Sequence, residues 1–153
     1  MSMTHRSLHT QQGAFLLEAL IGILIFSLGI LGIVGLQAQA MRFTNDAEYR
    51  AEAVYLANSL ISQMWADPQS TLKAKYDSTV GGAKYTQFLL DVQNGMPGAI
   101  LTTPPVVKVD DPSLPAAVTK TSSVVQVQIS WRMPGDPVTT VHNYTTTGVI
   151  GQN

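Results

Sequence analysis

The chain has 153 residues, a formal net charge of −1 and 12% charged residues. This length leaves room for one compact domain beside a long helix, which excludes a large enzyme. The weak charge gives no electrostatic footprint for nucleic acid or anionic lipid headgroups, and the lack of cysteine excludes disulfides, thiol catalysis and zinc–cysteine sites. The expected partners are therefore proteins.

The chain opens with a polar segment, residues 1–13, that has no acidic residue and reads as a leader. Residues 14–36 are apolar apart from Glu18 and Ser27, and the next charge is Arg42. A bilayer core of about 30 Å needs a helix of about 20 apolar residues. We therefore predict a transmembrane helix over about residues 14–36.

An ordinary secretory signal peptide is an alternative interpretation of this region. Its apolar segment spans about 7–15 residues and ends in a small-x-small cleavage site. The apolar run here is longer, although residues 38–40 (AQA) offer such a site just after it. Conventional cleavage after Ala40 is the less favoured hypothesis.

Four glycines interrupt the apolar run: Gly22, Gly29, Gly32 and Gly35. Glycine is better tolerated in membrane helices than in water-exposed ones. Small residues allow close packing against neighbouring helices, and a glycine-rich stretch also unwinds more easily. Both interpretations stay open.

The helical pattern continues past the apolar run. Apolar residues recur at steps of three or four and predict one packed face, made of Phe43, Ala47, Ala51, Val54, Ala57, Ile61 and Met64. Pro68 disfavours the helical conformation at Asp67, so the helix is predicted to end near Trp65 or Ala66.

The remaining residues, 67–153, predict a β-rich domain. Residues 85–92 are expected to form a strand and residues 94–115, with their prolines and glycines, a long irregular loop. Residues 123–132 (SVVQVQISWR) alternate between apolar and polar side chains, as a half-buried antiparallel strand requires. The turn MPGDP and the β-branched residues 138–150 then predict a terminal hairpin.

Glu18 is the most informative residue of the apolar run. A charge at the centre of a bilayer costs about 2.5–3.5 kcal/mol or more, and a carboxylate near the interface still bears part of that cost. Cleavage after Gly13 would create an α-amino group at Ala14, one helical turn before Glu18. Such an amine would offset the carboxylate within its own chain or between neighbouring chains.

The arrangement QQG-AFLLE-ALIGILIF resembles the type IV prepilin family. The resemblance implies cleavage between Gly13 and Ala14 by a prepilin peptidase, N-methylation of Ala14, and docking of the subunit into a filament through Glu18. Separately, we predict helix packing through Phe15 and, in the first of the two interpretations above, through the four glycines. The segments at residues 27–42 and 51–64 are similar to those of PilV-like minor pilins.

The resemblance implies an α+β, pilin-like fold with a leader (1–13), a long N-terminal helix (14–66) whose first half is transmembrane, and a periplasmic β-rich domain (67–153) with a small antiparallel sheet. The implied function is that of a non-enzymatic minor pilin that helps to initiate type IV pilus assembly. Its implied partners are minor and major pilins, the prepilin peptidase and the inner-membrane assembly platform. A minor pseudopilin of a type II secretion system and a signal-anchored periplasmic enzyme or accessory subunit are the alternatives.

Residues that could act in catalysis or bind a metal form no strong pattern in the sequence. His142 lies among threonines in a predicted strand and is interpreted as structural, because no histidine besides it follows the leader. His5 and His9 have metal-compatible spacing but lie in the leader. Asp110 and Asp111 are interpreted as solvated turn residues. Residues 143–145 (NYT) match the N-glycosylation pattern, which often arises by chance. We expect no cofactor, metal, nucleic acid or small-molecule substrate.

Overall fold

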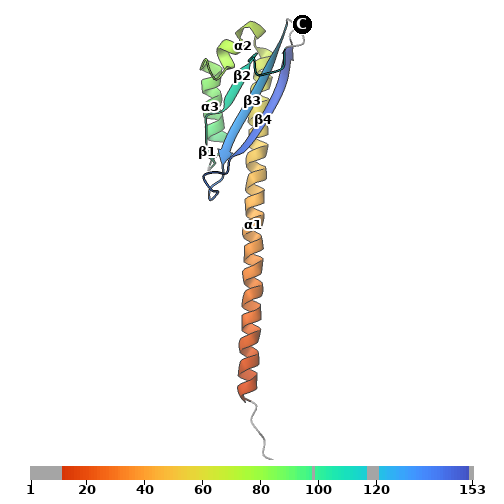
Figure 1. The fold of residues 1–153 in the computed structure, drawn as a ribbon, viewed down its shortest axis with the longest axis vertical. Coiled ribbons are helices and arrows are strands. Elements are labelled where there is room, and N and C mark those ends of the chain that lie inside the picture. The colour runs from red at the N-terminus through yellow and green to blue at the C-terminus, as the bar shows by residue number, and fades with distance from the viewer. Residues whose placement is uncertain (1–11, 98, 117–120, 152–153) are drawn as a thin grey trace, which may run out of the picture. The chain divides into compact units, whose positions relative to one another are not determined.

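The computed structural model describes residues 12–97, 99–116 and 121–151. It has the element order α1 (Gln12–Ala66), α2 (Gln69–Tyr76), α3 (Ala83–Gly95), β1 (Ile100–Leu101), β2 (Val106–Val109), β3 (Ser122–Arg132) and β4 (His142–Gly151) (Figure 1). The predicted α+β class, with a long N-terminal helix and a small antiparallel sheet, is confirmed. The chain divides between Thr44 and Asn45 into two compact units.

Helix α1 ends at Ala66, as predicted from Pro68. Asp67 donates its backbone N–H to the Met64 carbonyl (3.2 Å), and Pro68 becomes the N-cap of α2. Of the predicted leader (1–13), residues 1–11, with His5 and His9, lie outside the described residues, whereas Gln12 and Gly13 belong to α1.

The packed face of α1 was predicted with the wrong rotation about the helix axis. Ala57 and Met64 are buried, but Phe43, Ala47 and Ala51 are exposed. The buried face has the spacing i, i+3, i+4, i+7, i+11 and consists of Ala53, Leu56, Ala57, Leu60 and Met64. Two leucines, which bury more apolar area than the predicted alanines, determine this rotation.

Strand β3 is the centre of the sheet and confirms the predicted strand at 123–132. Along one side it pairs antiparallel with β4, and along the other side with β2 and β1. Its apolar face is fully buried, at Val125, Val127, Ile129 and Trp131, whereas the intervening polar residues are partly exposed. This alternation is the one read from the sequence.

The predicted terminal hairpin is also confirmed, with a later start for its second strand. Pairing runs from Trp131 opposite His142 to Ser122 opposite Gly151. Residues 138–141 belong to the connection instead, where Thr140 donates its N–H to the Pro137 carbonyl (2.9 Å). The turn itself needs a left-handed backbone at Gly135, whose φ is +89°.

The strand predicted at 85–92 is wrong, because these residues lie in helix α3. The buried side chains of α3 are Tyr85, Phe88 and Val92, which recur at helical steps of three and four. The irregular loop predicted at 94–115 is also wrong in part, since it contains β1 and β2. Val107 and Val109 face the core at a spacing of two, which a strand requires.

Helix α2 was not predicted, and it lies between α1 and α3 in the chain. Leu72 and Tyr76 are buried, and the Tyr76 hydroxyl donates to Asp67 Oδ2 (2.7 Å) while Lys75 Nζ lies 2.8 Å from Asp67 Oδ1. Burial, followed by the Asp67 carboxylate, raises the pKa of Tyr76. The two hydrogen bonds from Lys75 and Tyr76 lower the pKa of Asp67.

Candidate functional site at the start of helix α1

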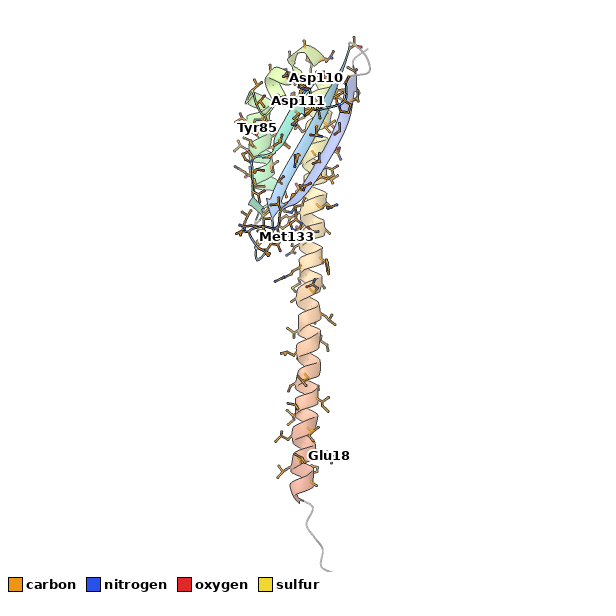
Figure 2. The ribbon with its side chains drawn as sticks, in the orientation of Figure 1. Glu18, Tyr85, Asp110, Asp111 and Met133 are labelled. Atoms are coloured by element: carbon orange, nitrogen blue, oxygen red, sulfur yellow. The ribbon has the colours of Figure 1, made fainter. Side chains whose placement is uncertain are left out.

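The residues that the sequence singles out lie at the start of α1. Gly13, Ala14 and Phe15 are helical, and Glu18 follows Ala14 by four residues, which is about 6 Å along the helix axis. Residues at this spacing share one face of a helix. Figure 2 shows the Glu18 side chain projecting from α1. All four residues, Gly13, Ala14, Phe15 and Glu18, are exposed.

The segment after Glu18 is apolar over its whole circumference. Helix α1 is long and apolar enough to span a membrane, and its most apolar window is not buried at all within the chain. Ser27 donates its hydroxyl to the Ile23 carbonyl (2.7 Å), so this polar group needs no water. Glu18 is thus the remaining polar side chain between Ala14 and Leu36.

Among the described residues, the predicted packing residues of α1 are uncovered. Phe15 is 73% exposed, and a Cβ added at Gly22, Gly29, Gly32 or Gly35 would meet nothing within 4 Å. The helix is continuous through all four glycines.

His142 occupies a different environment, in the globular unit. Its Nε2 lies 3.0 Å from Asp136 Oδ2, its Nδ1 lies 3.1 Å from Asp46 Oδ1, and its ring stacks on Trp131 with a centroid distance of 6.1 Å. The ring is therefore hydrogen-bonded to the Asp136 carboxylate and stacked on the indole, with the Asp46 carboxylate close to its other nitrogen. The hydrogen bonds of the described residues join it to no serine or threonine hydroxyl, as a nucleophile–base pair would need.

Asp110 and Asp111 were interpreted as solvated turn residues, but Asp110 has structural hydrogen bonds. It has a φ of +49°, its Oδ1 accepts the Val124 N–H (2.8 Å), and its own N–H donates to the Val124 carbonyl (2.9 Å). Asp111 Oδ1 accepts the Ser113 N–H (2.8 Å) and the Ser113 hydroxyl, which lower its pKa. Both aspartates thus shape the loop after β2 (Figure 2).

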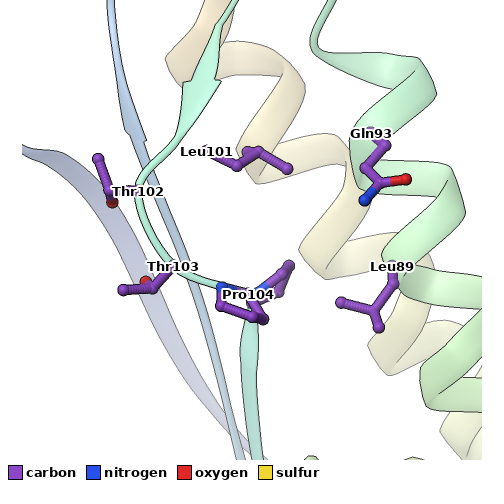
Figure 3. Close-up of a pocket in the computed structure, with 7 residues that line it drawn as sticks. Leu89, Gln93, Leu101, Thr102, Thr103 and Pro104 are labelled. Atoms are coloured by element: carbon purple, nitrogen blue, oxygen red, sulfur yellow. The ribbon is translucent and has the colours of Figure 1, made fainter.

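One pocket of the globular unit has a volume of about 300 Å³ and lies between α3 and the segment that joins β1 to β2 (Figure 3). It carries no charged side chain and is lined by Leu89, Gln93, Leu101, Thr102, Thr103, Pro104 and Pro105. Across residues 12–97, 99–116 and 121–151, no group of three or more His, Cys, Asp or Glu residues is placed to hold a metal ion. The pocket therefore offers no acid–base or metal chemistry.

Sequence reasoning missed Asp77, a buried carboxylate that is 3% exposed. Its Oδ1 accepts the Thr79 N–H (2.8 Å) and hydroxyl, and its Oδ2 accepts the Val109 N–H (3.0 Å). Burial alone would raise the pKa of Asp77, but the hydrogen bonds from Thr79 and Val109 outweigh it and lower that pKa. The available signal was the D-x-T spacing of residues 77–79, which is typical of a local turn in which the aspartate accepts from the backbone.

Comparisons with protein-family models, with curated proteins and with solved structures give no match to this chain.

Proposed function

We propose that this chain is a minor pilin of a type IV pilus, similar to the PilV-like minor pilins, and that it helps to initiate filament assembly without catalysing a reaction. The observation that carries the proposal is the exposed carboxylate of Glu18, one turn after Ala14 at the start of an otherwise apolar helix. The predicted class of fold, with an antiparallel sheet after this helix, supports it.

The physical argument concerns the negative charge of the Glu18 carboxylate. Among the described residues, no cation lies within ion-pair distance of Glu18. Cleavage after Gly13 would place an ammonium group at Ala14, on the same helix face. At about 6 Å and an effective dielectric constant of about 20, the two charges would attract each other by about 3 kcal/mol. This attraction is comparable to the cost of placing a carboxylate in a membrane.

The same amine offers an assembly mechanism. In a bundle of such helices, the amine of one subunit and the Glu18 carboxylate of a neighbour neutralise each other when the two helices are in the right axial register. The exposed apolar side chains between residues 19 and 36 would then pack against neighbouring helices instead of lipid. The C-terminal unit would lie in the periplasm before assembly.

Intact-mass measurement of the mature protein tests this function. The protein is purified from membranes of cells that contain an active prepilin peptidase and, as a control, from cells that lack it. We expect loss of residues 1–13 and addition of one methyl group in the first sample, and the full-length chain in the second. Retention of the leader when the peptidase is active would refute the proposal, and cleavage after Ala40 would instead identify a secreted protein.

A further inference from the structure

Strand β4 leaves one edge of the sheet open. Its ten residues, His142–Gly151, pair with β3 on one side. On the other side, no described strand pairs with β4, and no other backbone hydrogen bond among the described residues involves it. Alternate residues of an antiparallel strand direct their N–H and C=O groups away from the paired neighbour. β4 therefore presents a row of unused donors and acceptors.

The opposite edge of the sheet is protected, which makes the β4 edge conspicuous. That edge consists of two short strands, β1 and β2, of two and four residues, with Pro104 and Pro105 between them and Lys108 within β2. Short strands, prolines and lysines are the usual devices against strand addition. β4 is long, has no proline or formally charged residue, and reads HNYTTTGVIG.

The layer beneath β4 is also incomplete. The core-facing residues of β3, such as Val127 and Ile129, are 0% exposed. The residues of β4 opposite them, Thr146 and Tyr144, are only half-buried. The core is therefore thinner beside Tyr144 and Thr146 than at the end of β4, where Ile150 is fully buried, and one further strand would complete the cover.

Helix α1 supplies an apolar surface beside this edge. A Cβ on Gly148 would lie 3.9 Å from Ile61 Cδ1, so Ile61 lies beneath β4. Val54 and Trp65 are seven residues before and four residues after Ile61, which places them on the same side of α1. Val54 is half-buried and Trp65 is 51% exposed. We call Val54, Ile61 and Trp65 the α1 flank.

We propose that the β4 edge binds an extended segment of a different protein chain, which adds to the sheet as a strand. The segment is uncharged and has apolar side chains at every second residue. Its backbone pairs with β4, and its apolar side chains cover the α1 flank. After His142, which faces Asp46 and Asp136, β4 carries no formally charged side chain. A charge that enters the edge along residues 143–151 would lose water without gaining a partner on β4, which selects against charged segments.

A second copy of this chain is a poor occupant. Two β4 edges related by a two-fold axis would pair antiparallel. The residues of β4 that face the core include Thr146 and Gly148, which offer little apolar surface to cover the α1 flank of the other copy.

The test uses the full-length protein in detergent micelles and a fluorescent synthetic peptide with blocked termini and the uncharged sequence of residues 122–131 (SSVVQVQISW). This peptide has the required apolar alternation, and β4 already pairs with the same sequence within the chain. Fluorescence anisotropy measures binding, and hydrogen exchange locates it. We expect saturable binding and slower exchange of alternate amides along β4, with no change along β1 and β2.

Three variants sharpen the test. Thr146→Lys puts a charge on the core-facing side of the edge and is expected to weaken peptide binding about tenfold or more. Thr139→Lys is the matched control, because Thr139 is exposed in the connection before β4, and it should bind normally. Trp65→Ser removes part of the α1 flank without changing β4 and should weaken binding about tenfold.

Several outcomes would overturn the proposal. They are the absence of binding, equal weakening by Thr146→Lys and Thr139→Lys, and protection of amides on the β1–β2 side. Sedimentation that shows a dimer, abolished by Thr146→Lys, would instead identify a second copy as the occupant. None of these results depends on the mature N-terminus, so the proposed pilin function and this edge can fail independently.

Discussion

Replacement of Asp77 by alanine is expected to destabilise the globular unit severely. The carboxylate accepts two backbone N–H groups, from Thr79 at 2.8 Å and Val109 at 3.0 Å. Val109 is 1% exposed, so water cannot replace its lost acceptor. A hydrogen bond to a charged group contributes about 1.5–3 kcal/mol, so the loss of both should lower the free energy of unfolding by about 3–6 kcal/mol. Whole domains are stable by about 5–15 kcal/mol.

Tryptophan fluorescence during urea unfolding of the full chain in detergent micelles measures this loss. Trp131 is fully buried, whereas Trp65 is 51% exposed, so a Trp65→Phe background makes Trp131 the reporter of the sheet. Asp111→Ala is the matched control, because Asp111 accepts the N–H of Ser113 two residues later but lies in an exposed loop. Equal urea midpoints for the two variants would refute the assignment of Asp77 as a structural centre.

Three further predictions concern acid, backbone packing and assembly. The folded-state pKa values of Asp67 and Asp77 are lowered, so their stabilising contribution is complete above the ordinary carboxyl pKa of about 4 and is lost as the pH falls through the lowered values. Urea midpoints should therefore be steady from about pH 7 to 5 and fall below about pH 4. Asp77→Ala should flatten this fall, and an unchanged slope in the variant would contradict the prediction. Gly82→Ala would bring a Cβ into a clash with the backbone carbonyl oxygens of Ala74 and Lys75 in α2, which should lower the free energy of unfolding by about 2 kcal/mol or more. The same urea assay measures this loss, and a wild-type midpoint would contradict the predicted clash. The Glu18→Ala variant should still be cleaved, because the scissile bond is untouched, but it should reduce the number of filaments counted by electron microscopy. Glu48→Ala, which changes an exposed glutamate farther along α1, should leave the number of filaments unchanged. Normal filament numbers in the Glu18→Ala variant would show that Glu18 takes no part in assembly.

The parts of the fold that sequence reasoning predicted correctly are those in which one local pattern dominates. The strict alternation at residues 123–132 matches β3, and Pro68 determines the end of α1 through local sterics. Glu18 stood out for a similar reason, since it is the one charge in a long apolar run. Such signals need no knowledge of the rest of the chain.

The errors arose where tertiary contacts decide between local alternatives. Tyr85, Phe88 and Val92 are aromatic or β-branched, which favours a strand by propensity, yet their spacing buries them together on one face of α3. The D-x-T spacing of residues 77–79 indicates only a local turn at Asp77. The hydrogen bond that its second oxygen accepts from Val109, 32 residues away, becomes visible only when β2 is placed beside α2. Long-range pairing of this kind leaves little trace in a single sequence.

The position of β3 in the chain has a consequence for folding. Every strand pair among the described residues includes β3, and β3 is the second-last element. No part of the sheet can form until residues 122–132 have left the ribosome or a translocation channel. Until then, the apolar faces of α1 and α3, with Leu56, Leu60 and Phe88, have no sheet to cover them. A chain made or exported from its N-terminus therefore passes through a state that exposes helical apolar surface, and this interval is when holding chaperones would be of most use to it.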